Sequence, residues 1–168
     1  DIIITAHQPT GIFYGIQTLL QMLPPEIKNS QKQKGIDWTV PCTDITDKPQ
    51  FAWRGLMLDV SRHWFTKEEV KKYIDELAEY KMNVFHWHLT DDQGWRLEIK
   101  SLPRLTEVGA WRAPRVGQWW QRAPQQPGEE TTYGGFYTQE DVKEVLAYAA
   151  ERYVRVIPEI DVPGHSLA

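Results

Sequence analysis

Three groups of ionisable side chains each come directly after an apolar stretch of the sequence. They are Arg62-His63, which follows RGLMLDVS, Asp91-Asp92, which follows MNVFHWHLT, and Asp161 with His165, which follow YVRVIPEI. Guanidinium, carboxylate and imidazole groups can bind hydroxyl groups, orient one another and transfer protons. The sequence therefore indicates one polar site to which three segments contribute.

The apolar stretches and the segments between them alternate as strands and helices. Strands are expected over 54–60, 82–89 and 153–160. Capping boxes open two helices, one at Thr66 with Glu69 and one at Thr138 with Asp141. The first helix has an apolar face made of Val70, Tyr73, Ile74, Leu77 and Tyr80. This alternation predicts an α/β fold with a parallel sheet, and the three polar groups are expected to meet at the carboxyl edge of that sheet, where barrel enzymes carry their catalytic residues.

The first 48 residues have a different pattern. Apolar residues at helical spacing predict a helix over 10–23, which Pro24-Pro25 end. Residues 36–44 alternate in the manner of an extended strand, and we place a domain boundary near residue 48. Further along, a short helix is expected near 103–111 and a long loop over 114–135.

Composition argues against several classes of protein. The 168 residues carry a net charge of −4, whereas nucleic-acid binding usually needs a basic patch. Cys42 is the single cysteine, so an internal disulfide and a cysteine-based zinc cluster are excluded. No run of 18 apolar residues occurs, so no membrane span is expected. We expect no cofactor, no nucleic-acid partner and no membrane-spanning helix.

Four segments of the sequence resemble glycoside hydrolase family 20, the β-N-acetylhexosaminidases. They are RGLMLDVSRHWF (54–65), YKMNVFHWHLTDDQGWRLEI (80–99), GGFYTQEDVKEVLAYAAERYVRVIPEID (134–161) and VPGH (162–165). The stretch TGIFYGIQTLLQML (10–23) is similar to the end of the small domain that precedes the barrel in this family. The combination of DxSRH, HxHLxDDQGWR and PEIDxPGH makes the resemblance specific.

The resemblance implies a (β/α)8 TIM barrel, of which this sequence holds the first three strands, preceded by part of a small α+β domain. Residues 1–48 are expected to be the C-terminal part of the small domain, and residues 49–168 the N-terminal part of the barrel. The family's catalytic Asp-Glu pair lies in a His-x-Gly-Gly-Asp-Glu segment, which does not occur in this sequence. We therefore expect the 168 residues alone to be inactive, and to be insoluble, oligomeric or supported by further chain segments, because a three-stranded piece has unpaired strand edges.

The activity implied by the resemblance is removal of terminal β-linked N-acetylglucosamine or N-acetylgalactosamine with retention of configuration. In that family the acetamido group of the substrate attacks the anomeric carbon, in place of a protein nucleophile. The expected partners are glycans or chitin-like oligosaccharides and the rest of the protein's own barrel. A secreted, periplasmic or lysosome-like compartment is expected for the parent protein.

Three residues take active-site roles by this resemblance. Arg62 is expected to bind hydroxyls of the terminal sugar, although pairing with Asp59 or Asp92 is the alternative that the residue by itself suggests. Asp91 and His165 are expected to form a carboxylate–imidazole pair that leads to the catalytic Glu. Without the resemblance, a helix N-cap for Asp91 and a hydrogen-bonded loop histidine for His165 are the favoured explanations; with it, the pair is favoured.

Other residues near the three groups are expected to support them. Asp161 is expected to hold the turn 163–165 by accepting backbone N–H bonds. Structural roles are expected for Asp59, Asp92 and Trp95. For Trp64, Trp119 and Trp120, both stacking on a sugar and covering the barrel remain open.

Two further functions stay open at this point. His86 and His88 lie two apart on a strand and share a face, so with Asp91, Asp161 and His165 they could bind a metal in a barrel hydrolase. The alternative is that both histidines fill the interior of the barrel. A non-catalytic carbohydrate-binding fragment is the remaining possibility.

Overall fold

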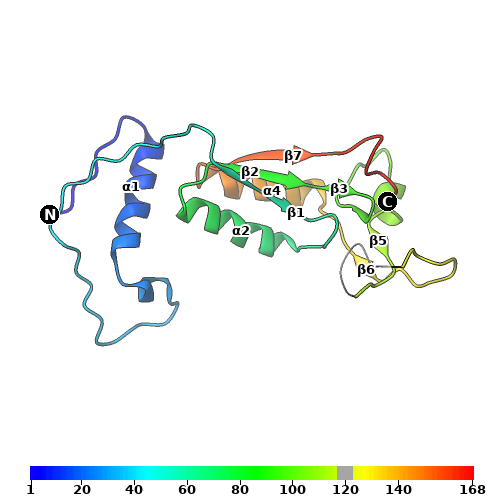
Figure 1. Cartoon of the computed structure of the whole chain (residues 1–168), viewed down its shortest axis with the longest axis horizontal. Coiled ribbons are helices and arrows are strands. Elements are labelled where there is room, and N and C mark those ends of the chain that lie inside the picture. The colour runs from blue at the N-terminus through cyan, green and yellow to red at the C-terminus, as the bar shows by residue number, and fades with distance from the viewer. Residues whose placement is uncertain (117–122) are drawn as a thin grey trace.

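Three short apolar segments pair side by side as a parallel sheet, and they confirm the three strands expected from the sequence (Figure 1). The computed structural model describes residues 1–116 and 123–168. The strands are β1 (Gly55–Asp59), β2 (Val84–His88) and β7 (Arg155–Glu159), in the order β1-β2-β7. Their register aligns the last residues of the three strands in one row, Asp59 beside His88 and His88 beside Glu159.

Two amphipathic helices cover one face of the sheet. They are α2 (Lys67–Glu79) and α4 (Gln139–Ala150), and both begin with the capping boxes that the sequence predicts. Phe85 and Trp87 of β2 are buried in the core that these helices complete. Because side chains alternate along a strand, His86 and His88 lie on the opposite face.

The predicted apolar face of α2 is right with one exception. Val70, Ile74 and Leu77 are buried as expected, but Tyr80 is 66% exposed. The helix ends at Glu79, so Tyr80 is its C-cap residue and no longer follows the helical face.

The amino-terminal part lies beyond the amino ends of the strands (Figure 1). It contains α1 (Pro9–Met22) and the 3₁₀ helix η1 (Pro25–Lys28), and none of residues 1–50 is buried. Two of its contacts with the rest of the chain are hydrogen bonds from Gln21 Nε2 to the Glu79 carbonyl (2.7 Å) and from Lys81 Nζ to Thr18 Oγ1 (2.6 Å). The strand expected over 36–44 does not form, and none of the strands that the structure describes pairs with these residues.

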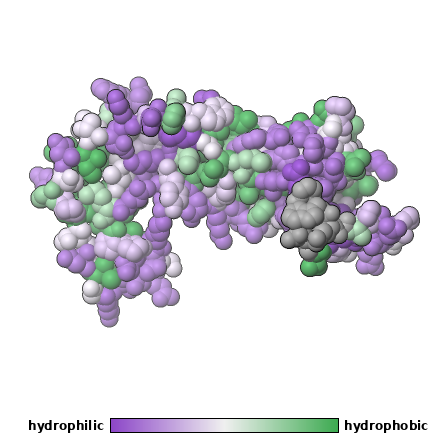
Figure 2. Space-filling model, in the orientation of Figure 1, coloured by the Kyte–Doolittle hydropathy of each residue, from purple (hydrophilic) through white to green (hydrophobic). Residues whose placement is uncertain are grey.

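Short elements gather at the carboxyl edge of the sheet. These are β3 (Thr90–Asp91) paired with β4 (Gly94–Trp95), α3 (Arg104–Glu107), and β5 (Trp111–Arg112) paired with β6 (Tyr133–Gly134). Among the described residues, no helix combines the length and apolar character needed to cross a bilayer. Hydrophobic side chains on the face seen in Figure 2 form scattered groups between hydrophilic ones.

Candidate active site

The candidate site is built at the carboxyl edge, where the row of strand-end residues meets the loops that follow the strands. Asp91 lies at its centre and is 2% exposed. Its Oδ2 is 2.7 Å from Arg62 Nη2 and 2.9 Å from His88 Nε2. Its Oδ1 accepts a hydrogen bond from the Asp92 amide (2.8 Å) and lies 3.2 Å from His165 Nδ1. The structure thus brings Arg62, Asp91 and His165 together.

The neighbours of Asp91 keep its carboxylate ionised. Burial by itself raises the pKa of Asp91, but contacts with His88, the Asp92 amide, His165 and Arg62 outweigh burial, and the pKa is lowered. For His88 the balance has the opposite sign: burial lowers the pKa, and the contacts with Asp91 and Glu159 outweigh it and raise the pKa. The two groups therefore stabilise each other as an ion pair.

Arg62 joins two carboxylates. Its Nη1 donates to Asp59 Oδ2 (2.7 Å), while its Nη2 contacts Asp91. The alternative pairing with Asp59 is thus present, together with the contact that the resemblance implies. The Arg62 side chain is 36% exposed, so remaining N–H groups of its planar fork can reach a ligand. Asp59 also accepts the backbone N–H groups of Ser61 and Arg62 through Oδ1 (both 3.0 Å), which fixes the turn after β1.

His165 faces solvent on its other side. Its side chain is 57% exposed, and since Nδ1 is directed at Asp91, Nε2 is the nitrogen left for a further partner. The turn before it is not held in the expected way. Among the described residues, no backbone N–H of that turn donates to the Asp161 carboxylate; instead the Asp161 amide donates to Thr90 Oγ1 (2.9 Å), and Ser166 Oγ donates to the Pro163 carbonyl (2.6 Å).

Two residues that the sequence analysis did not assign to the site, Glu159 and Arg96, are essential to its construction. Glu159 ends β7 and contacts His88 Nδ1 (3.1 Å) and His86 Nε2. It stands two residues before Asp161, and this spacing at a strand end was the one signal that could have identified it.

Arg96 is completely buried and ties the loops of the carboxyl edge together. Among the described residues, the hydrogen-bond partners of its guanidinium are all backbone carbonyls, those of Val60, Ser61, Gln93, Ala110 and Gly135. Burial first, and then the nearby Arg112, lower the pKa of Arg96 to about 10, so it remains charged at neutral pH. It holds the loops that carry Arg62 and Asp91 in place.

The alternative metal site, which the sequence left open, has its potential ligands in two overlapping groups. His88, Asp91 and Asp161 form one set whose ligand atoms lie within 4.8 Å of one another, and Asp91, Asp92 and His165 form the other. His86 belongs to neither set. Asp91 Oδ2 already contacts Arg62 Nη2 (2.7 Å) and His88 Nε2 (2.9 Å), so a metal ion at that oxygen would have to displace these contacts.

The remaining predicted residues have structural contacts. The Trp64 ring packs against the ring of buried Tyr137, with 4.6 Å between the ring centroids. Trp95 Nε1 donates to the Leu97 carbonyl (2.7 Å), and Asp92 Oδ1 accepts from the Leu167 amide (3.3 Å). Trp119 and Trp120 lie outside the described residues.

Comparison with family models places both parts of the chain in one family. Residues 51–168 match the catalytic domain of glycosyl hydrolase family 20, and residues 1–48 match domain 2 of the same family.

Individual proteins give the same result. The chain is 50% identical over 158 residues to a β-hexosaminidase of Porphyromonas gingivalis, covering 94% of the chain and 18% of that protein. It is 50% identical over 163 residues to a β-hexosaminidase of Vibrio furnissii, covering 97% of the chain and 25% of that protein. A Streptomyces plicatus β-hexosaminidase mutant, solved in complex with its product N-acetylglucosamine, superposes with a TM-score of 0.82 at 46% identity, over 96% of this chain and 29% of that one. The chain therefore spans a quarter or less of the length of these two curated relatives.

Proposed function

Because the chain belongs to glycosyl hydrolase family 20, we propose that its protein is a retaining β-N-acetylhexosaminidase acting on terminal β-linked N-acetylglucosamine or N-acetylgalactosamine. The reaction proceeds with the 2-acetamido group of the substrate as nucleophile. The observation that carries this proposal is the buried Asp91 carboxylate, which contacts Arg62 on one oxygen and His165 on the other. The substrates are N-acetylhexosamine-terminated glycans or chitin-like oligosaccharides.

Arg62 binds the terminal sugar in this proposal. Asp59 contacts Nη1 of Arg62 and Asp91 contacts Nη2, so the guanidinium plane is fixed before the ligand arrives. A fixed fork of N–H donors suits vicinal hydroxyl groups, which are spaced for two parallel hydrogen bonds.

Asp91 and His165 act on the general acid without touching the glycosidic bond. The carboxylate on Nδ1 fixes the tautomer of His165, and Nε2 then presents a defined donor or acceptor to the acid. None of the residues above is itself the general acid. Asp161 supports the same edge through its backbone contact with Thr90.

The sheet is proposed to be the first three strands of a (β/α)8 barrel. Parallel order, crossover helices on one face and polar residues at the carboxyl ends support this architecture. Residues 1–48 are proposed to be the C-terminal part of the preceding small α+β domain, and residues 49–168 to begin the barrel.

Hydrolysis by the full-length protein tests the proposal. We expect turnover of 4-nitrophenyl N-acetyl-β-glucosaminide, and no turnover of 4-nitrophenyl β-glucoside, which lacks the acetamido nucleophile. Chelation with EDTA should leave the rate unchanged, whereas a metal-dependent hydrolase would lose it. Arg62→Lys should raise KM about tenfold, because an ammonium cannot replace the planar fork. Equal turnover of both substrates would contradict the proposal.

A further inference from the structure

Both ring nitrogens of His88 face carboxylates. Nε2 lies 2.9 Å from Asp91 Oδ2, and Nδ1 lies 3.1 Å from Glu159 Oε2. A neutral imidazole has one donor and one acceptor nitrogen, whereas an ionised carboxylate only accepts. Both contacts are favourable only when both nitrogens carry a proton, so the geometry favours an imidazolium at His88, which is only 4% exposed.

Glu159 extends this arrangement to a second histidine. The oxygen that faces His88 also contacts His86 Nε2. Strand pairing dictates the contact, because His88 is the register partner of Glu159, and His86 lies two residues earlier on the same face. The contacts thus run from His86, whose side chain is 41% exposed, through the buried His88 and Asp91 to the exposed His165.

We propose that His86, Glu159 and His88 are positioning residues that hold Asp91 in the one orientation that serves both Arg62 and His165. The inference rests on the proposed function, because its catalytic consequence passes through Asp91. His88 and Arg62 share Asp91 Oδ2, so rotation of that carboxylate is opposed and Oδ1 stays directed at His165.

Charge supports the same arrangement. Three carboxylates surround His88: Asp59 from β1, Asp91 from β3 and Glu159 from β7. Arg62 contacts the same oxygen of Asp91 as His88 does, and His86 contacts the same oxygen of Glu159 as His88 does. A cationic His88 therefore lies between acidic neighbours and is stabilised in place.

Two substitutions of His88 separate positioning from packing. His88→Gln places an amide donor near the position of Nε2 and keeps the bond to Asp91, whereas His88→Asn places its donor near Nδ1 and loses that bond. In the full-length protein we expect kcat to fall about tenfold for Gln and about a hundredfold for Asn, with little change in KM. His7→Gln, at an exposed position in the amino-terminal part, is the matched control and should leave kcat unchanged.

The pH profile gives a readout that packing alone would not move. The acidic limb of kcat/KM should shift to higher pH in both variants, because Asp91 loses the positive charge of His88 that favours its ionised form. The shift should be larger in His88→Asn, because Asp91 there also loses its hydrogen-bond donor. Equal losses for Gln and Asn with an unshifted profile would show that His88 only fills space. Glu159→Gln keeps the shape of its side chain, and should shift the profile in the same direction by a smaller amount.

Histidine NMR tests the positioning chain independently of activity. With selective ¹⁵N-histidine labelling, and assignment through His88→Gln, we expect both His88 nitrogens to be protonated at pH 7. Glu159→Gln should lower the pH at which His88 loses its proton. A neutral His88 at pH 7 in the unmodified protein would overturn the inference. Absence of hydrolysis together with a protonated His88 would instead overturn the proposed function alone.

Discussion

Two arginines at the carboxyl edge of the sheet have opposite surroundings. Arg62 is partly exposed, and its positive charge is balanced by the carboxylates of Asp59 and Asp91. Arg96 is completely buried, and among the residues that the structure describes no carboxylate pairs with it. Backbone carbonyls from four separate parts of the chain surround its guanidinium instead.

This difference gives the two arginines different roles: Arg96 belongs to the scaffold, and Arg62 belongs to the candidate site. Carbonyl groups are fixed by the backbone, so every bond that Arg96 makes also fixes a loop. The carboxylates of Asp59 and Asp91 hold the Arg62 guanidinium but leave its side chain 36% exposed, so its remaining N–H groups can reach a ligand. Buried Arg96 thus holds the loops at the carboxyl edge of the sheet in place, and the ion pairs of Arg62 form the candidate site on those loops.

Arg96→Met would break the scaffold and is expected to have the largest effect. Five backbone carbonyls would lose the guanidinium as a donor; the Ala110 carbonyl keeps the Gly135 amide (3.3 Å), but the others lose a bond at a site where an unsatisfied group is costly. We expect the free energy of unfolding to fall by about 3–5 kcal/mol. Chemical denaturation of the full-length protein measures this, and Arg96→Lys, which keeps the charge and some donors, should lose less. A change within experimental error for Met would contradict the scaffold role.

Asp91→Asn tests the ion pairs around Arg62. The amide keeps the shape of the carboxylate but removes the charge that Arg62 and His88 share. We expect kcat on the chromogenic N-acetylglucosaminide to fall about a hundredfold, since misplacement of the residues that orient the reaction has this order of effect. The unfolding free energy should fall less than in Arg96→Met. The reverse order of the two stability losses would show that the ion pairs, and not Arg96, form the scaffold.

The sequence was enough to predict that three polar groups lie close together, because parallel strands bring their carboxyl ends to one edge of the sheet. Arg62, Asp91 and His165 each follow a recognisable strand, and the capping boxes at Thr66 and Thr138 locate the crossover helices. These are local patterns with a single geometric consequence. That is why the meeting of three distant segments could be predicted without coordinates.

Arg96 could not be predicted in the same way. Its carbonyl partners Val60, Ala110 and Gly135 lie 36, 14 and 39 residues away in the sequence, and a carbonyl carries no side-chain signature. The contact of His88 with Glu159 depends on the register between β2 and β7, which alternation alone does not determine. Sequence patterns therefore identified the polar residues that follow the strands, but not the buried contacts that hold them.

The ion-pair network should make stability depend on pH, whereas Arg96 should not. The pKa of Asp91 is lowered from 3.8, so its contribution is present above that value and is lost as the pH falls through the lower folded pKa. The pKa of His88 is raised from 6.5, so its contribution is complete below 6.5 and is lost as the pH rises through the higher folded pKa. We expect the network to contribute most between pH 3.8 and 6.5.

Thermal unfolding across pH 3 to 9 measures this window. The melting temperature should decline by a few degrees on each side, and Asp91→Asn should flatten both declines. Arg96 keeps its charge over the whole range, because its pKa is about 10. An unchanged pH dependence in Asp91→Asn would show that other groups produce the decline.

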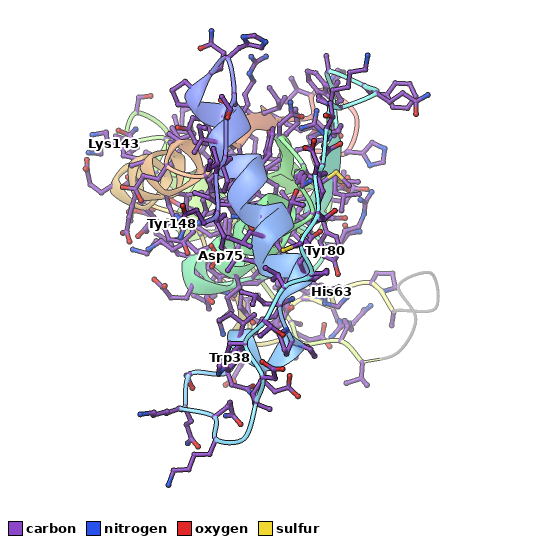
Figure 3. The ribbon with its side chains drawn as sticks, turned by 90° about the vertical axis from the view of Figure 1, so that its left-hand side faces the viewer. Trp38, His63, Asp75, Tyr80, Lys143 and Tyr148 are labelled. Carbon is purple, nitrogen blue, oxygen red and sulfur yellow. The ribbon has the colours of Figure 1, made fainter. Side chains whose placement is uncertain are left out.

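A third polar cluster lies at the surface. It tests how far burial determines the loss of unfolding free energy when a hydrogen bond is removed. Tyr148 of α4 donates to the Asp75 carboxylate of α2 (2.8 Å), and Arg152 Nε also contacts that carboxylate (2.6 Å). Asp75 and Tyr148 are labelled in Figure 3. Tyr148→Phe removes only the hydroxyl and keeps the ring that lies 3.4 Å from the Arg152 guanidinium. We expect a loss of about 0.5 kcal/mol in unfolding free energy, because water replaces a bond at an exposed site. A loss as large as that of Arg96→Met would show that burial does not determine the cost of losing these bonds.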